Sequence, residues 1–262
     1  MMSDVKGIPA FLDRIVEKAN DIHYKGDSVS PYLAMDTFGK LASLLLIAAL
    51  SLLFDEFVWW KCLLLFVSVA FLYGTVYVGI IKKRLLRSVS KSYLQDTVLF
   101  IIPISLGVIW LLGIPLRAGF DMVGLILPVM LTFKRIGCFL GGCCFGLPSR
   151  FGVLYSRKVI DYYPNERKNN PNLVPQTRVF PIQLVEAFVN LALFVWLFVR
   201  LIVNETLAGD TLLLYLFVYS AYRFIADFFR TSSVRPRIGR WSEAQLVSAI
   251  LFLLCLGIYV LK

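Results

Sequence analysis

The stretch "PIQLVEAFVNLALFVWLFVRLIV", Pro181 to Val203, decides the fold class of this chain. It is almost wholly apolar. A helix needs roughly 20 apolar residues to cross a hydrocarbon core of about 30 Å, and the stretch is long enough to do so. Because an open strand cannot satisfy its backbone hydrogen bonds in lipid, the stretch predicts a transmembrane helix.

Six further segments have the same character, and hydrophobic residues make up 58% of the 262 residues. That composition excludes a soluble domain of this length. The fourth predicted span is the weakest, since Pro128 and the pair Lys134 and Arg135 interrupt it. We therefore predict an all-α, polytopic membrane protein of about seven transmembrane helices, at 36–54, 57–81, 96–116, 119–140, 181–203, 211–229 and 242–261.

The first 35 residues differ from the rest. They have mixed charges and lack the apolar core of a signal peptide. Apolar residues recur there at helical spacing, which predicts an amphipathic helix lying in the membrane interface. These residues are Ile8, Phe11, Leu12, Ile15, Ala19 and Ile22. The segment also holds the only histidine, His23, which we expect at the water boundary. An intramembrane Ser-His-Asp triad is therefore not expected.

The net charge of +10 is unevenly distributed. Residues 82–91 hold five basic residues and no acid, and two further basic loops lie at 134–178 and 230–240. The alternate loops, 55–57 and 204–210, are acidic or poor in charge. This distribution is typical of membrane proteins, with the basic loops in the cytoplasm, and it argues against nucleic acid as a partner. Alternatively, the basic loops recruit anionic lipid headgroups.

Three of the five cysteines lie in "KRIGCFLGGCCFG", residues 134–146. A zinc site is the least favoured explanation, because zinc usually takes four Cys or His ligands and no fourth one is near. We accordingly expect no metal and no cofactor. A disulfide from Cys138 to Cys143 or Cys144 would suit an oxidising compartment. Thiolates activated by Arg135 are a third possibility. The last is that small residues here let helices pack closely.

Ionisable residues inside apolar spans are costly and usually mark function. The fifth span places Gln183, Glu186 and Asn190 on one face. The sixth places Tyr219, Arg223, Asp227 and Arg230 on one face, where Arg223 and Asp227 can pair. Ser242 is a plausible N-cap for the seventh helix. Because arginine pairs with phosphate bidentately, these groups and Arg135 predict a site for a phospholipid headgroup. Structural ion pairs between helices are the alternative.

Four motifs in this order, "RIGCFLGGCCFG", "FPIQLVEA", "YRFIADFFR" and "WSEAQL", resemble those of the prolipoprotein diacylglyceryl transferase family. The resemblance covers about residues 118–261. It implies a seven-helix enzyme of the bacterial inner membrane that moves the diacylglyceryl group of phosphatidylglycerol onto the lipobox cysteine of a prolipoprotein. The by-product is glycerol-1-phosphate. The implied partners are phosphatidylglycerol, or another anionic phospholipid, and a prolipoprotein.

The polar residues of the spans, the cysteine cluster and the resemblance together indicate which residues form the site. The expected catalytic residues are Arg135, Glu186, Arg223, Asp227, Cys143 and Cys144. The expected substrate-binding residues are Cys138, Gly142, Gly146, Gln183, Arg230, Ser242 and Gln245. Arg135 and Arg223 would stabilise charge on the leaving phosphate, and Glu186 or Asp227 would act as the base. Cys143 or Cys144 could instead be the nucleophile.

The chain departs from the family pattern at three positions. Cys138 stands where the family signature has Asn, and Cys143 where it has Glu. The family's "H-G-G" histidine has no counterpart, since residues 71–79 read "FLYGTVYVG". These departures leave a thiol-redox protein and a non-catalytic phospholipid-binding relative as alternatives to the transferase.

The sequence thus divides into an N-terminal amphipathic segment, 1–35, and a single transmembrane, transferase-like domain, 36–262. The latter contains the signature at 134–146 and a polar arm at 147–179, which we expect to be a loop because it is rich in Pro, Asn and charge.

Overall fold

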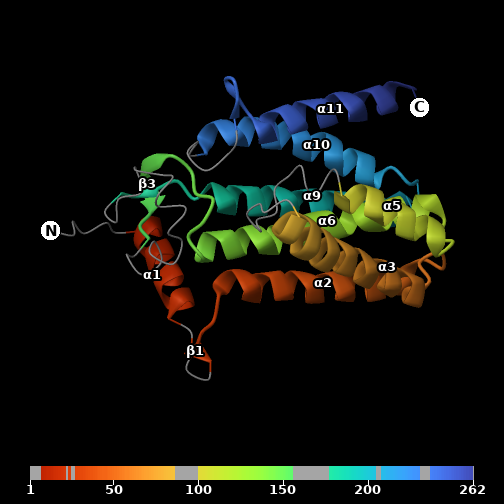
Figure 1. Cartoon of the computed structure of the whole chain (residues 1–262), viewed down its shortest axis with the longest axis horizontal. Helices are drawn as coiled ribbons and strands as arrows, with labels where there is room; N and C mark the ends of the chain where they lie inside the picture. The colour runs from red at the N-terminus through yellow and green to blue at the C-terminus, as the bar shows by residue number, and fades with distance from the viewer. Residues whose placement is uncertain are drawn as a thin grey trace. The chain divides into compact units, whose positions relative to one another are not determined.

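A computed structural model describes residues 7–21, 23–24, 27–85, 100–155, 177–204, 208–230 and 237–261 (Figure 1). The chain divides into two compact units. The first contains Met1–Leu41, Val129–Leu193 and Ile225–Ser242, and the second contains Ala42–Pro128, Phe194–Phe224 and Glu243–Lys262. Most of the predicted site residues belong to the first unit.

Six helices in the described residues are long and apolar enough to cross a membrane, which confirms the polytopic, all-α prediction. Their mean hydropathies run from 1.4 to 2.4. The helices are α2 (Pro31–Leu53), α3 (Trp59–Phe71) continued by the π-helix η1 (Leu72–Leu85), α6 (Leu116–Leu140), α9 (Ile182–Asn204), α10 (Thr211–Ala226) continued by the 3-10 turn η3 (Asp227–Phe229), and α11 (Glu243–Leu261).

The third predicted span, 96–116, is shorter in the structure. Its described helix, α5, covers Ile102–Leu111. Gly113 then adopts a positive φ of 58°, and Pro115 follows two residues later, so the helix cannot continue to residue 116. Residues 96–99 lie outside the described residues. The count of about seven helices therefore corresponds to six long helices and one short one.

The expected interruption of the fourth span is absent, because α6 runs through Pro128 for 25 residues. Proline is tolerated in membrane helices where the neighbouring structure compensates for its missing N–H.

Helix α6 packs closely on α2 near its end. The Nζ of Lys134 lies 3.7 Å from a carboxylate oxygen of Asp36 on α2. Gly137 lets α2 approach, since a Cβ there would lie 3.1 Å from the Cα of Tyr32. The close-packing interpretation is thus confirmed for this glycine.

The predicted N-terminal helix is α1, Ile8–Asn20. Its apolar face is divided between two environments. Ile8 and Phe11 are exposed. Leu12 and Ile15 instead pack on a core cluster that includes Val16 and Phe139. His23 follows in the short strand β1 (His23–Tyr24), which pairs antiparallel with β2 (Asp27–Ser28). Part of the face predicted to meet lipid is therefore covered by protein.

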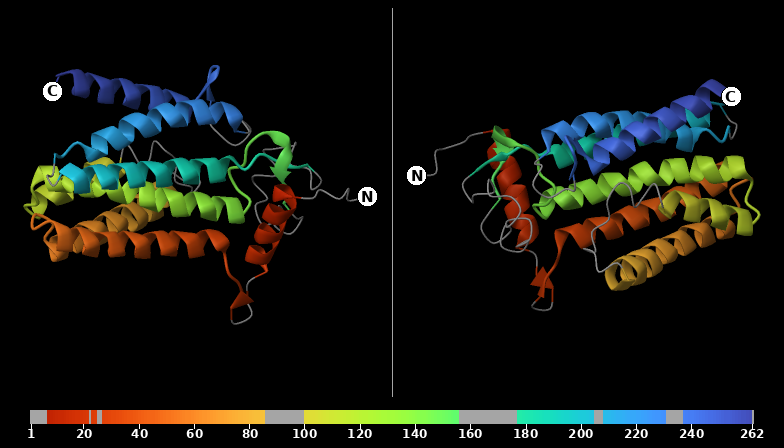
Figure 2. Two further views of the ribbon diagram at one scale, coloured as in Figure 1. Left: turned by 180° about the vertical axis from the view of Figure 1, so that it is seen from behind. Right: turned by 45° about the horizontal axis from the view of Figure 1, so that its top comes forward.

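The polar arm begins with a strand rather than a loop. Strand β3 (Pro148–Val153) lies beside α1 in both views of Figure 2, and bridges join Pro148 and Val153 to Val179 at the other end of the arm. Residues 156–176 lie outside the described residues. Burial of Val153 and Val179 in the core cluster explains why these ends are ordered despite the polar composition of the arm.

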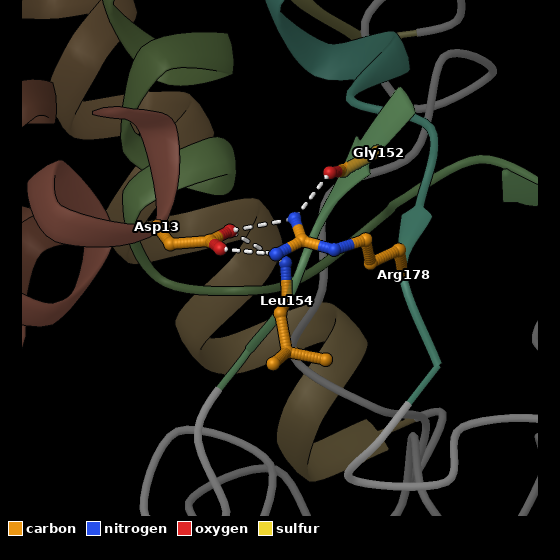
Figure 3. A network of polar contacts seen from close by, with 4 residues as sticks. All are labelled: Asp13, Gly152, Leu154 and Arg178. Carbon is orange, nitrogen blue, oxygen red and sulfur yellow. Dashed lines mark hydrogen bonds and ion pairs between the residues drawn. The ribbon is translucent and has the colours of Figure 1, made fainter. Parts of the chain in front are cut away.

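An ion-pair network fastens α1 to both ends of the arm (Figure 3). The carboxylate of Asp13 accepts a hydrogen bond of 2.9 Å from the backbone N–H of Leu154 and one of 2.7 Å from Nη2 of Arg178. Nη1 of Arg178 donates to the carbonyl of Gly152 at 2.9 Å. A charged pair with this many hydrogen bonds fixes the geometry of the groups it joins.

In the second unit, a buried aspartate caps a helix from a distance. The carboxylate of Asp121, in α6, accepts hydrogen bonds from the N–H groups of Gly209 at 2.9 Å and Thr211 at 3.1 Å, where α10 begins. Helix N-termini leave such N–H groups unpaired, and negative charge is favourable beside them. Gly124, one turn further along α6, allows the approach, since a Cβ there would lie 2.5 Å from the backbone nitrogen of Leu212.

Replacing Asp121 with Ala is expected to lower the free energy of unfolding by about 2–3 kcal/mol, because one buried and one partly buried N–H group lose their acceptor. Thermal unfolding in detergent measures the effect. Asp55→Ala, at an exposed position, is the control and should leave the unfolding temperature unchanged. Equal stability of the two variants would contradict the capping role.

Candidate functional site

The cysteine-rich signature is a helix end. The N–H of Cys143 donates to the carbonyl of Cys138 at 3.0 Å, and the N–H of Gly142 donates to the carbonyl of Phe139 at 3.3 Å. Gly142 has a φ of 71°. This pair of bonds, closed by a glycine in the left-handed conformation, is the Schellman motif that ends many helices. Gly142 is therefore required by the backbone, and it turns the chain back so that Cys143 and Cys144 lie near Cys138.

Side chains from three other segments hold this turn. Nε2 of Gln183 donates to the carbonyl of Cys143 at 2.7 Å. Nδ2 of Asn20 donates to the carbonyl of Leu140 at 2.8 Å, and the hydroxyl of Tyr155 donates to that of Phe139 at 2.9 Å. Gln183 was expected to bind substrate, and its observed contact is with the turn. Sequence reasoning missed Asn20 and Tyr155, since nothing in their local patterns links them to residues more than a dozen positions away.

Gly146 lies where three backbone segments meet. The N–H of Gly146 donates to the carbonyl of Phe180 at 2.9 Å. The N–H of Leu147, the next residue, donates to the carbonyl of Phe229 at 3.1 Å. A β-bridge joins Gly146 to Arg230. A Cβ on Gly146 would lie 2.8 Å from the Phe180 oxygen and 2.9 Å from the Phe229 oxygen. The absence of a side chain thus permits the packing that places Arg230 beside α9.

Glu186 is the centre of the site. Its side chain is fully buried, and its two oxygens are in ion pairs with two different arginines. Nε of Arg135, from α6, lies 2.9 Å from Oε1, and Nη2 of Arg230 pairs with Oε2. Arg230 is 2% exposed and Arg135 is 16% exposed, so Arg135 is the more accessible of the two arginines.

The sequence pattern predicts Tyr219 and Arg230 on one face of the sixth helix. In the structure the helix ends before Arg230, so the two residues do not share a helical face. Helix α10 ends at Ala226, and Arg230 has an extended backbone with φ −100° and ψ 149°. The bridge to Gly146 explains this conformation.

Asp227, at the start of η3, accepts a hydrogen bond from the hydroxyl of Ser242. Ser242 lies in strand β5 (Trp241–Ser242), which pairs with β4 (Arg237–Ile238). The residue expected to cap α11 is thus joined to a predicted catalytic acid.

All five cysteines are free thiols, so the structure has no disulfide between Cys138 and Cys143 or Cys144. The sulfur atoms of these three cysteines lie within 4.8 Å of one another. Cys144 is half-buried and has a φ of 57°, which is uncommon for a residue with a side chain. Hydrogen bonds from Cys138 and Cys143, aided by the charges of Arg135 and Arg230, place the pKa of Cys144 well below its usual value. The hydrogen bonds of Cys143 with Cys138 and Cys144, together with burial, raise the pKa of Cys143.

Two predicted site residues belong to the second unit. Arg223, in α10, and Gln245, in α11, are both buried there. Their participation in the site, and the pairing of Arg223 with Asp227, stay predictions. The first unit holds the other predicted residues.

Residues 97–261 match the family model described as prolipoprotein diacylglyceryl transferase. The chain belongs to this family. It is 30% identical over 132 residues to a phosphatidylglycerol–prolipoprotein diacylglyceryl transferase of Clostridium tetani (strain Massachusetts / E88), a match that covers 49% of this chain and 46% of the relative.

A second family member, phosphatidylglycerol–prolipoprotein diacylglyceryl transferase 2 of Clostridium perfringens (strain 13 / Type A), is 30% identical over 128 residues. That match covers 48% of this chain and 44% of the relative. The chain thus spans about half the length of the curated relatives it matches. The matched region of the family model includes all the predicted site residues.

Proposed function

We propose that this protein transfers the diacylglyceryl group of phosphatidylglycerol to an acceptor thiol, by default the lipobox cysteine of a prolipoprotein, in the bacterial inner membrane. Family membership and the names of the two relatives support this donor and acceptor. The six long apolar helices of the described residues support a lipid substrate taken from the membrane.

The observation that carries the proposal is the carboxylate of Glu186 between two guanidinium groups. Arg135 and Arg230 thus bring two guanidinium groups to one buried carboxylate, and positive charge there favours an anion nearby. A phosphate ester is a suitable partner, because arginine forms paired hydrogen bonds with phosphate oxygens. The more exposed Arg135 would meet it first.

The reaction itself is a displacement at carbon. The sulfur of the acceptor thiolate attacks the glycerol carbon that carries the phosphate ester, and a C–S bond forms as the C–O bond breaks. The electron pair leaves with the phosphate oxygen of glycerol-1-phosphate. Arg135 would stabilise that negative charge without reorganising.

The acceptor thiol must lose its proton first. Glu186 has both of its oxygens in ion pairs, so its part in this proposal is to position Arg135 and Arg230. Asp227, which Ser242 positions by a hydrogen bond, is the better candidate for the base.

The direct test uses the protein purified with its lipids, labelled phosphatidylglycerol and a lipobox peptide. Release of labelled glycerol phosphate together with a lipidated peptide is the expected result. Bound phospholipid without turnover would instead indicate a non-catalytic relative. Thiols that cycle to a disulfide in intact membranes, without lipid transfer, would indicate a redox protein.

In that assay, Arg135→Lys is expected to lower kcat/KM about 10- to 100-fold, since lysine keeps the charge but loses the planar pair of donors. The expected signature includes a raised KM for phosphatidylglycerol. Arg150→Lys is the matched control, because Arg150 is exposed in β3 of the same unit. Wild-type kinetics in Arg135→Lys would remove this residue from the phosphate site.

A further inference from the structure

The signature turn gathers three thiols from a short length of chain. Cys138 lies in the last turn of α6, and the Schellman motif returns the chain so that Cys143 and Cys144 lie beside it. Gln183 and Tyr155 fix the carbonyls of this turn from other segments. The three sulfur atoms, within 4.8 Å of one another, are therefore gathered by a turn that hydrogen bonds from other segments hold in place.

This spacing is close to that of a zinc site. Zinc–sulfur bonds of about 2.3 Å in a tetrahedron place the sulfur atoms about 3.8 Å apart, so rotamer shifts of about 1 Å or less would complete the ligand set. Within the part of the chain that the structure describes, this cluster offers three ligands. Three protein ligands with one open position are typical of catalytic zinc, whereas structural zinc takes four.

The charges around the cluster fit this metal. Zinc with three thiolates has a net charge of −1. Arg135 and Arg230 already act electrostatically on Cys144, so a compensating positive charge is in place.

We infer that Cys138, Cys143 and Cys144 bind Zn²⁺ and leave its fourth position for the acceptor thiol. The inference rests on the proposed transferase function for the identity of that fourth ligand, and it replaces our sequence expectation of no metal. Zinc deprotonates a coordinating thiol outright. The metal would therefore supply the reactive thiolate in a chain whose only histidine is His23.

The acceptor thiol releases its proton to water or to Asp227 when its sulfur binds the metal. That sulfur then attacks the glycerol carbon, and glycerol phosphate leaves with the C–O electron pair. The neutral thioether binds zinc weakly and dissociates. If Cys143 or Cys144 attacked the lipid directly, the product would be a stable thioether on the enzyme, which could not be passed on. Activation of the acceptor thiol explains the cysteines better than a covalent intermediate.

The first experiment measures metal binding alone. The full chain, purified in detergent and dialysed against Zn²⁺, is expected to hold one zinc per chain. Replacement by Co²⁺ should produce the intense near-ultraviolet absorption of cobalt–thiolate charge transfer. Cys138→Ser, Cys143→Ser and Cys144→Ser should each reduce the affinity for zinc at least 100-fold. Cys62→Ser and Cys255→Ser, at buried thiols of α3 and α11, are the matched controls and should retain full binding.

Wild-type protein that binds less than about one fifth of an equivalent of zinc would overturn the inference, whatever the variants do. Full binding by Cys144→Ser, with its folding verified by thermal unfolding, would also overturn it.

The second experiment tests the open position. Adding the lipobox peptide to the cobalt-loaded protein should increase the charge-transfer absorption, because a fourth sulfur joins the metal, and the peptide with Ser in place of Cys should not. An unchanged spectrum with the cysteine peptide would overturn the assignment of the fourth ligand. The two proposals fail separately. A cobalt–thiolate spectrum without lipid transfer refutes the transferase function and leaves the metal site, whereas lipid transfer that survives complete removal of metal refutes only the part of zinc in activating the acceptor thiol.

Discussion

Replacing Glu186 with Gln is expected to reduce diacylglyceryl transfer at least 1,000-fold and to lower the free energy of unfolding by about 3–5 kcal/mol. The side chain is fully buried between Arg135 and Arg230. Removing one partner of a buried ion pair leaves the remaining charges uncompensated, which costs more than the pair contributes when intact. The arginines would also lose the orientation needed for a phosphate ester.

Lipid transfer and thermal unfolding of Glu186→Gln are measured in the same detergent preparation. Glu56→Gln is the control, because Glu56 is exposed between α2 and α3. It should match the wild-type protein in both measurements. A Glu186→Gln variant with wild-type turnover would show that the arginines are held by other contacts.

The second large effect is expected at a residue with no side chain. Gly146→Ala should lower activity about 100-fold, because the new Cβ would meet the carbonyl oxygens of Phe180 and Phe229 at 2.8 and 2.9 Å. Both oxygens belong to the backbone, so relief requires the chain before Arg230 to move away. A shift of about 1 Å there suffices to misplace the guanidinium that pairs with Glu186.

Gly257→Ala provides the matched control for this substitution. Gly257 lies in α11, and a Cβ there would meet nothing within 4 Å. Alanine favours a helix over glycine by about 0.5–1 kcal/mol, so this variant should be as active as wild type and slightly more stable. Activity of Gly146→Ala equal to that of Gly257→Ala would contradict the role of the close approach in placing Arg230.

The helices were predictable because lipid imposes a simple rule on composition and length. The stretch from Pro181 to Val203 satisfies that rule and becomes α9 within a residue at each end. Length and composition did not predict where glycine and proline end a helix and where they do not. Residues 112–116 are apolar enough to continue a helix, but Gly113 and Pro115 end it. Conversely, Pro128 did not break α6.

The site was partly predictable for a different reason. Helical periodicity places Gln183 and Glu186 on one face of α9, and both meet the signature segment. Periodicity named Arg230 but could not pair it with Glu186, because the position of Arg230 depends on an extended backbone beyond the end of α10. Nor could spacing show that Cys138, Cys143 and Cys144 converge, since that follows from the left-handed Gly142.

The network of Asp13, Arg178 and Leu154 has a practical consequence for mapping the protein in the membrane. Because β3 and Val179 are paired and both are tied to α1, the chain leaves this corner at Tyr155 and returns to it at Thr177. In general, lengthening a flexible loop between two fixed ends costs about 0.6 kcal/mol for each doubling of its length. A protease site or epitope tag inserted between Tyr155 and Thr177 should therefore leave the arginine pair undisturbed while reporting which face of the bilayer the signature occupies.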